Sequence, residues 1–392
     1  MRPQRSTLLS PFREVKSSIY HCVSRCVDRD FKFGDAERDE FVKVMRLYED
    51  FCGVQVLAYV VLSNHWHVMV EVPPESEREE ISDEELLRRL SLVSGEDYVS
   101  RIGSELAEHR RNHAAKKLQK LRERFTNRMC NLSEFMKMLK WRFSMWFNHR
   151  HDRVGTLWEQ RFKSVLVEGG LAARTIAAYI DLNPVRAGLV DDPKDFRWCS
   201  YGAAMAGDKL ARAGLERVMA RFDAGNAAEV VADGAHHRIA GKKVEGGAGK
   251  QVRRGMRREK MELGKKGKNS TKQALAEYRM VMFEDGEKLD GDRRRGLSAE
   301  AVAAVLEAGG TLSLAQSLRC RVRYFTDGAV IGTREFVNEF FRASKELAGG
   351  SGGAEGLAIS KRKTGARKMK GLSLDAASGE AGGLYALRDL QG

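Results

Sequence analysis

Several features that mark other protein classes are scarce or absent in this 392-residue sequence. No stretch approaches the roughly 18 apolar residues of a membrane helix, and the opening "MRPQRSTLLSPFREV" lacks the apolar core of a signal peptide. The six cysteines include no CxxC pair, which disfavours both a zinc site and a disulfide framework. No P-loop is present, so ATP use is not expected. These absences predict a soluble cytoplasmic protein with free thiols and no membrane contact.

Positive charge, by contrast, is abundant. Sixty-eight Lys and Arg residues against 54 Asp and Glu give a net charge of +14. Between residues 241 and 272 the sequence holds twelve Lys or Arg and three Glu, interspersed with glycine. Such a balance favours a polyanionic partner, nucleic acid above all, over a basic tail that serves only solubility.

Hydrophobic periodicity predicts an alternation of strands and helices over the first half of the chain. Strands are expected where β-branched and aromatic residues concentrate, and helices where apolar residues recur every three or four positions. The expected strands are 17–27, 54–62, 65–72 and 161–168, and the expected helices are 35–53, 107–125, 133–147 and 171–184. Apart from a charged insertion, this order is β-α-β-β-α-β-α.

That order predicts an α+β fold with a ferredoxin-like βαββαβ sheet and one extra C-terminal helix. The expected main domain covers residues 10–205 and includes a charged helical insertion at 75–131. We expect a basic flexible linker at 206–297, a small, mostly helical domain of unknown role at 298–350, and a disordered tail at 351–392.

Two histidines stand one residue apart in the expected strand "HWHVMVEV". Side chains alternate faces along a strand, so His65 and His67 share one face while Trp66 lies on the other. The apolar face should pack on the helices, which leaves the histidines on the open face of the sheet. Two neutral imidazoles at this spacing can bind one divalent cation, although an idle surface pair gives the same pattern.

A second pair of polar residues lies in "AAYIDLNPV". Tyr179 and Asn183 are four residues apart and face the same way if the helix extends that far. Asn183 offers a neutral oxygen that could join two histidine nitrogens around Mg²⁺ or Mn²⁺. Because Pro184 disfavours helical geometry at the residue before it, Asn183 could equally be a cap that ends the helix.

Four segments in order resemble one family of enzymes. "YHCVSR", "SNHWHVMVEV", "GTLWEQRFKSVLVE" and "YIDLNPVRAGLV" are together similar to the HUH single-tyrosine transposases, specifically the REP-associated tyrosine transposase branch of the insertion-sequence transposases. The resemblance covers roughly residues 10–205. The insertion at 75–131 and the sequence beyond 207 depart from the compact members of the family.

The resemblance implies a role for each matching residue. Tyr179 matches the nucleophile, and His65, His67 and Asn183 match the ligands of a catalytic divalent metal, Mg²⁺ or Mn²⁺. It also implies single-stranded DNA with hairpins as the substrate, a homodimer, and a location at the nucleoid of a prokaryotic cell. The expected reaction cleaves and rejoins single-stranded DNA through a 5′-phosphotyrosine.

Other residues are candidates for supporting roles. The expected phosphate contacts and a base-stacking side chain, which could equally be a core residue, are Arg25, Arg161, Lys163, Arg186 and Trp158. Glu71 and His21 are weaker candidates for a ligand or base. The alternative tyrosines, Tyr20, Tyr201 and Tyr324, have no polar residue four positions later in a matching motif.

A phenol with a pKa near 10 is a weak nucleophile, so the phosphate must be made more electrophilic by a bound cation. The covalent link would conserve the phosphodiester energy and permit rejoining without ATP. Two alternatives remain: a non-catalytic DNA- or RNA-binding protein on the same fold, and a metal-dependent hydrolase that uses water and in which Tyr179 is structural.

Overall fold

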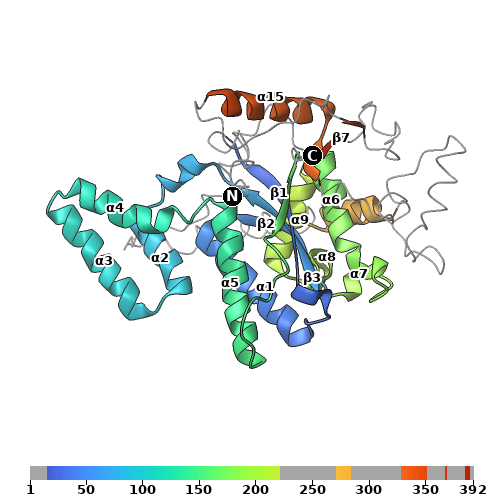
Figure 1. The fold of residues 1–392 in the computed structure, drawn as a ribbon, viewed down its shortest axis with the longest axis horizontal. Coiled ribbons are helices and arrows are strands. Elements are labelled where there is room, and N and C mark those ends of the chain that lie inside the picture. The colour runs from blue at the N-terminus through green and yellow to red at the C-terminus, as the bar shows by residue number, and fades with distance from the viewer. Residues whose placement is uncertain (1–15, 221–270, 284–327, 351–366, 369–384, 389–392) are drawn as a thin grey trace, which may run out of the picture.

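A computed structural model describes residues 16–220, 271–283, 328–350, 367–368 and 385–388. It is a mixed α+β structure built around one sheet (Figure 1). Over the first half of the chain the elements are β1 (Ser18–Arg25), η2 (Val27–Arg29), α1 (Asp35–Cys52), β2 (Gln55–Val61), β3 (His65–Val72), η3 (Glu75–Arg78), α2 (Asp83–Val93), α3 (Glu96–Arg111), α4 (Ala115–Thr126), α5 (Leu132–Arg150) and β4 (Lys163–Val167).

The remaining elements are mostly helical. They are α6 (Leu171–Asp181), α7 (Asn183–Arg186), η4 (Pro193–Asp195), α8 (Ser200–Ala206), α9 (Lys209–Met219), a helix at 271–282, β5 (Gly328–Gly332), α15 (Arg334–Gly350), β6 (Arg367–Lys368) and β7 (Tyr385–Arg388). No described helix is long and apolar enough to cross a membrane.

The sheet has the strand order β2-β3-β1-β4-β5-β7-β6. Within its first four strands all neighbours are antiparallel, and β1 lies in the centre between β3 and β4. The predicted order of strands and helices is therefore present in the structure. β5 runs parallel to β4, pairing Leu166 with Val330. The predicted boundaries of the C-terminal domain stay a prediction, and residues 298–327 lie outside the described part of the chain.

Helices cover both faces of the sheet. On one face Trp66, Val68 and Val70 pack with α1 and α5 in a large apolar cluster. On the other, Met69 packs with α6, α8 and α9 in a second cluster, and Figure 1 shows the strands between these two sets of helices. The expectation that the histidine face is open was therefore wrong. It failed because α6, α8 and α9 supply apolar residues that bury this face as well.

The charged insertion forms three helices, α2, α3 and α4, which we call the arm (residues 83–126). Figure 1 shows it projecting to the left, on the side of α1 and α5 that is remote from α6. The single basic helix expected at 107–125 is wrong in detail, since it is split between α3 and α4. The chain turns between them, where His113 has a positive φ of 50° that a helix does not allow.

The thiols follow the expectation from the sequence. The five cysteines in the described part of the chain are free and buried, namely Cys22, Cys26, Cys52, Cys130 and Cys199. Cys320 lies outside the described residues.

Candidate active site on the tyrosine helix

The register of the sheet decides which side chains surround the histidines. His65 pairs with Arg25 of β1, and His67 pairs with Val23, which pairs in turn with Lys163 of β4. Directly opposite residues of antiparallel strands point to the same face. Arg25 therefore lies beside His65, and Lys163 lies two strands away from His67 on the same face.

His67 is held by a second histidine from the central strand. His21 Nε2 lies 3.0 Å from His67 Nδ1, and the two rings stack with centroids 5.2 Å apart. Both residues are buried. Burial, followed by the charges of His21, His65, Arg186 and Arg25, holds the pKa of His67 well below its usual range. A neutral imidazole that donates from Nδ1 to His21 keeps the lone pair of Nε2 for a cation.

The second histidine of the motif is oriented by its sequence neighbour. His65 Nδ1 lies 2.7 Å from Asn64 Oδ1, and since that oxygen only accepts, His65 donates from Nδ1. In a neutral ring this leaves the lone pair on Nε2. Metal-binding histidines are held in the same way, with one nitrogen bonded to a protein acceptor and the other directed at the metal.

Tyr179 meets this pair from the helix layer. It lies near the end of α6, and its ring contacts the rings of His67 and His21 edge-on, with centroids 6.0 Å and 6.3 Å apart. The guanidinium carbon of Arg186 lies 3.9 Å from the centre of the Tyr179 ring. Only 4 % of Tyr179 is exposed, so Arg186 and the two histidines enclose the phenol.

Asn183 lies one helical turn after Tyr179, as the spacing predicts. Its Nδ2 donates to the carbonyl oxygens of Tyr179, at 3.0 Å, and Ile180, at 3.1 Å. Pro184 has no N–H to donate to the Ile180 carbonyl four residues earlier, so the Asn183 side chain replaces that missing bond. The helix consequently continues into α7 after a single residue, Leu182, in near-helical geometry, rather than ending before the proline.

The amide oxygen of Asn183 has a different partner from the one expected. Arg186 Nη2 donates to Asn183 Oδ1 at 2.7 Å and to the Tyr179 carbonyl at 3.3 Å. A cation at this oxygen would therefore have to lie beside the Arg186 guanidinium or displace it. The two histidines fit a divalent cation, whereas Asn183 as placed here does not. Within the described ranges no three His, Cys, Asp or Glu side chains are grouped to hold a metal.

The other predicted residues are dispersed. Glu71 lies further along β3 and forms a bidentate ion pair with Arg217 of α9, at 2.8 Å and 2.9 Å. Trp158 packs in the core and donates from its indole nitrogen to Ser144 Oγ at 2.7 Å. Arg161 is exposed in the turn that precedes β4. His21, by contrast, joins the cluster directly.

A buried carboxylate behind Tyr179 was not found from the sequence. Asp181 is fully buried and accepts hydrogen bonds from Ser200 Oγ at 2.8 Å, the Tyr201 backbone N–H at 3.0 Å and Tyr278 Oη at 2.7 Å. Burial raises the pKa of Asp181 to about 6, although these hydrogen bonds act to lower it. Tyr278 belongs to the helix at 271–282, so a distant segment anchors the helix that carries Tyr179. No local sequence pattern links positions 97 residues apart.

Lys140 of α5 was also missed. It donates to Ser24 Oγ and to the Gln160 carbonyl, both at 2.9 Å, and its ammonium lies over the Trp158 ring. Burial lowers the pKa of Lys140 to about 8, and no carboxylate in the described part of the chain pairs with it. It fixes the loop that leads into β4, and in the sequence it resembles any lysine of an amphipathic helix.

The chain was also compared with known protein families, curated proteins and solved structures. No curated protein matches the chain. A solved structure described as "Structure of the REP associates tyrosine transposase bound to a REP hairpin" is similar at 14% identity, covering 50% of this chain and 82% of the other, with a TM-score of 0.31. Residues 14–84 match the family described as "Transposase IS200 like". That segment contains β1, α1 and the strand that carries both histidines, and over these residues the predicted similarity to the IS200-like transposases is confirmed.

Proposed function

We propose that this protein is a single-tyrosine DNA strand transferase of the transposase type, in which Tyr179 is the nucleophile. The observation that carries the proposal is the contact of Tyr179 with the HxH pair. The phenol ring lies 6.0 Å from the His67 ring, although the two residues are 112 positions apart. The match to the IS200-like transposases covers the histidine strand and supports DNA as the substrate.

The strand order supports a ferredoxin-like core. In β2-β3-β1-β4 the two central strands are the first and third of the βαββαβ unit, and α1 and α5 lie on one face. We propose that residues 10–205 form the catalytic domain and that the arm is an insertion into it. α6 then serves as the additional helix that brings Tyr179 to the opposite face.

The proposed reaction is a transesterification. Tyr179 Oη loses its proton as it bonds to the phosphorus of single-stranded DNA, and the bond from phosphorus to the 3′ oxygen breaks. The 3′ oxygen leaves as a hydroxyl and the 5′ phosphate stays on the tyrosine. A 3′-OH can attack this phosphotyrosine in the reverse sense, so strands are rejoined without a nucleotide cofactor.

The residues of the site supply charge and orientation. Arg186 and Arg25 bring positive charge to the face where the phosphate would lie, which stabilises the charge that develops on its oxygens. Lys163 and Arg161 are proposed to bind neighbouring phosphates. A divalent cation, Mg²⁺ or Mn²⁺, held by His65 and His67 would make the phosphorus more electrophilic.

Arg186 also controls access in this proposal. It covers the Tyr179 ring and occupies Asn183 Oδ1. A phosphate that bonds to Arg186 would draw the guanidinium off the ring, uncover the phenol and release the Asn183 oxygen as a third ligand. Binding of the substrate would thus complete the site.

The proposed reaction also indicates what the protein binds. We propose single-stranded DNA carrying hairpins as the substrate and a homodimer as the active form. The alternative is a DNA- or RNA-binding protein that has kept the fold and lost the reaction, and the position of Tyr179 against the histidines disfavours it.

A covalent adduct is the decisive observation. Wild-type protein incubated with a labelled hairpin oligonucleotide and Mn²⁺ is expected to give a protein-linked band on a denaturing gel, and Tyr179→Phe to give none. Tyr48→Phe, a change to a buried tyrosine of α1 in the other cluster, is the matched control and should retain the band. Cleavage that persists in Tyr179→Phe would disprove the tyrosine mechanism, and absence of cleavage by wild type on any hairpin would favour the binding protein.

A further inference from the structure

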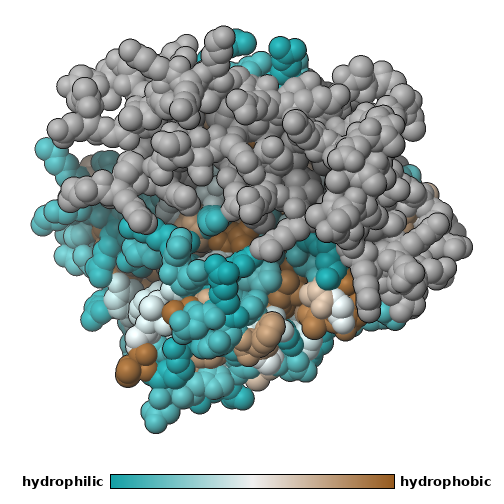
Figure 2. Space-filling model, turned by 45° about the vertical axis from the view of Figure 1, so that its right-hand side comes forward, coloured by the Kyte–Doolittle hydropathy of each residue, from teal (hydrophilic) through white to brown (hydrophobic). Residues whose placement is uncertain are grey.

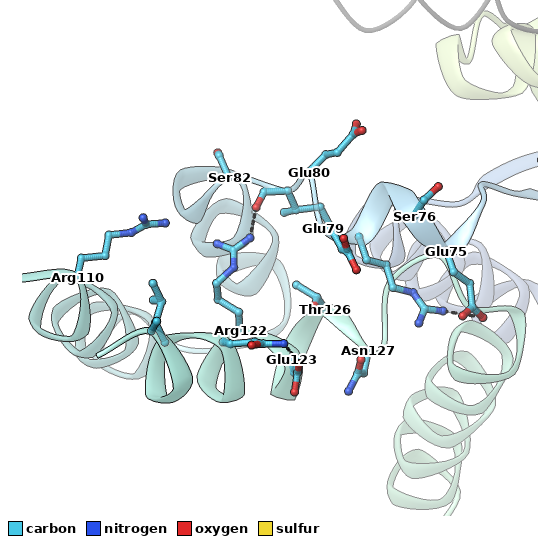
Figure 3. A pocket seen from close by; sticks show the side chains of 15 residues that line it. Glu75, Ser76, Glu79, Glu80, Ser82, Arg110, Arg122, Glu123, Thr126 and Asn127 are labelled. Carbon is cyan, nitrogen blue, oxygen red and sulfur yellow. Dashed lines mark hydrogen bonds and ion pairs between the residues drawn. The ribbon is translucent and has the colours of Figure 1, made fainter. Parts of the chain in front are cut away.

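The arm carries two hollows that differ in chemistry, although both are lined by α4. The larger, of about 1000 Å³, lies between η3, the start of α2, the end of α3 and α4 (Figure 3). Its lining includes four glutamates and three arginines. The arginines are all committed to neighbours: Arg110 and Arg122 to Asp83, and Arg78 to Glu75. Figure 3 shows Arg122 directed at the loop before α2 rather than into open space. This hollow has no charge left for an anion.

The smaller hollow, of about 260 Å³, has the opposite character. Its floor is formed by the buried side chains of Phe51, Leu90 and Phe125, and Tyr98 stands half-buried at its side. Arg124 and Arg128 complete the lining, which contains no Asp or Glu. The volume lies below the roughly 300–1,000 Å³ of sites for drug-sized ligands and suits a single planar ring system.

The two arginines of this hollow are uncompensated. In the described part of the chain neither forms an ion pair, in contrast to the arginines of the larger hollow. Both are exposed, and Arg124 lies 5.4 Å from the ring centre of Phe125. A guanidinium beside an aromatic floor binds both the phosphate and the face of a nucleotide.

A row of cations leads along α4 to the hollow. Lys117, Lys120, Arg124 and Arg128 follow one another at intervals of three or four residues, which places them on one side of the helix and its C-terminal turn. All four are exposed. The row covers roughly 17 Å at 1.5 Å per residue, enough for several successive phosphates. Among the described residues none of these four has a carboxylate partner, so a nucleic-acid strand would not have to displace one.

We propose that the arm is a second DNA-binding site, in which the α4 cations bind the backbone of a single strand and the hollow takes one unpaired base. The proposal rests on DNA being the substrate, as proposed above. The floor of the hollow offers aromatic and apolar surface without hydrogen-bonding groups directed at base edges, so the site selects unpaired over paired nucleotides rather than a sequence. The arm projects on the side of α1 and α5 that is remote from α6, the helix that carries Tyr179 (Figure 1), so it would hold DNA outside the cleavage site.

The test uses the full chain without divalent ions, so that binding is measured in the absence of cleavage. The probe is a fluorescein-labelled hairpin with an unpaired 3′ extension, and a blunt duplex of equal charge is the second probe. The variant combines Arg124→Gln with Arg128→Gln. Its matched control combines Lys43→Gln with Lys137→Gln, which removes the same charge from two exposed lysines that pair with glutamates.

For the extended hairpin we expect the Kd of the arginine variant to rise roughly tenfold and the slope of log Kd against log salt to fall by about 1.4, at about 0.7 per phosphate contact on a single strand. The control variant and the blunt duplex should change less than twofold. A 2-aminopurine in the extension should be quenched by wild type but not by Tyr98→Leu. Equal losses in the arginine and control variants, or equal losses on both probes, would overturn the proposal. Formation of the Tyr179 adduct is measured in a separate assay. The binding result can therefore be interpreted even if no adduct forms.

Discussion

The tyrosine helix and the arm use polar residues in opposite ways. Around α6 the polar side chains are buried and bonded to one another, as in the contacts of Asp181 with Ser200 and Tyr278. On the outer side of α4 the cations are exposed and unpaired within the described residues. In the view of Figure 2, hydrophilic residues cover much of the described surface, and hydrophobic patches lie between them. The buried polar side chains hold α6, and with it Tyr179, in position, whereas the exposed cations of α4 supply positive charge for binding.

The largest effect should come from the buried histidines. His67→Ala removes the imidazole that lies against both His21 and Tyr179. Loss of several kcal/mol of transition-state stabilisation corresponds to a fall of about 10²–10³ in the rate of adduct formation. Single-turnover cleavage of a labelled hairpin measures it, and DNA binding should change less than twofold. A fall in the cleavage rate below threefold would show that the cluster is merely structural.

Tyr278→Phe tests whether the buried network supports α6. The change removes only the hydroxyl bonded to Asp181 and leaves a buried carboxyl with one partner fewer, at a cost of about 1–3 kcal/mol in the free energy of unfolding. Urea denaturation measures it. Tyr98→Phe in the arm is the matched change and should cost under about 0.5 kcal/mol, because in the described part of the chain no hydrogen bond is made by the Tyr98 hydroxyl. If both variants lost the same free energy of unfolding, the buried network at α6 would not differ from the arm in its contribution to stability.

Lys140, buried beneath the loop that leads into β4, should make the stability of the protein depend on pH. Burial lowers the pKa of Lys140 to about 8 in the folded protein, so between about pH 8 and pH 10.5 the unfolded chain binds more protons. The stability of wild type relative to Lys140→Met should therefore rise as the pH rises through this window. Thermal melts of both proteins at several pH values between about 8 and 10.5 measure this trend. If the difference in stability between wild type and Lys140→Met did not change with pH, the Lys140 ammonium would be solvated in the folded protein.

The smallest effect is expected for an ion pair of the arm. Arg110→Gln breaks the contact with Asp83, but the arginine side chain is 56% exposed and Asp83 keeps Arg122. Exposed pairs contribute about 0–1 kcal/mol, so unfolding in urea should shift by no more than that. A loss greater than that of Tyr278→Phe would show that the arm depends on its charges for folding.

The local patterns of the sequence predicted the first four strands, the helices α1, α5 and α6, and the order of these elements. Strand alternation separated Trp66 from the histidines, and the four-residue spacing placed Asn183 one turn after Tyr179. The open histidine face was wrong because α8 and α9 pack there through residues whose partners are far away in sequence. Arg186 was expected to contact phosphate, but its position on the Tyr179 ring depends on how the helix passes Pro184, which spacing alone does not give.

The parallel pairing of β4 with β5 has a consequence for the order of folding. Leu166 and Val330 are neighbours in the sheet although 164 positions separate them (330 minus 166). At about 5–20 residues per second, a ribosome needs roughly 8–33 s to add that length. During this interval β1 to β4 can pair and gain both helical layers, while the outer edge of β4 stays without its neighbour. An unpaired edge is a template for other strands, so synthesis of this chain includes a period of exposure to mispairing that ends only when β5 arrives.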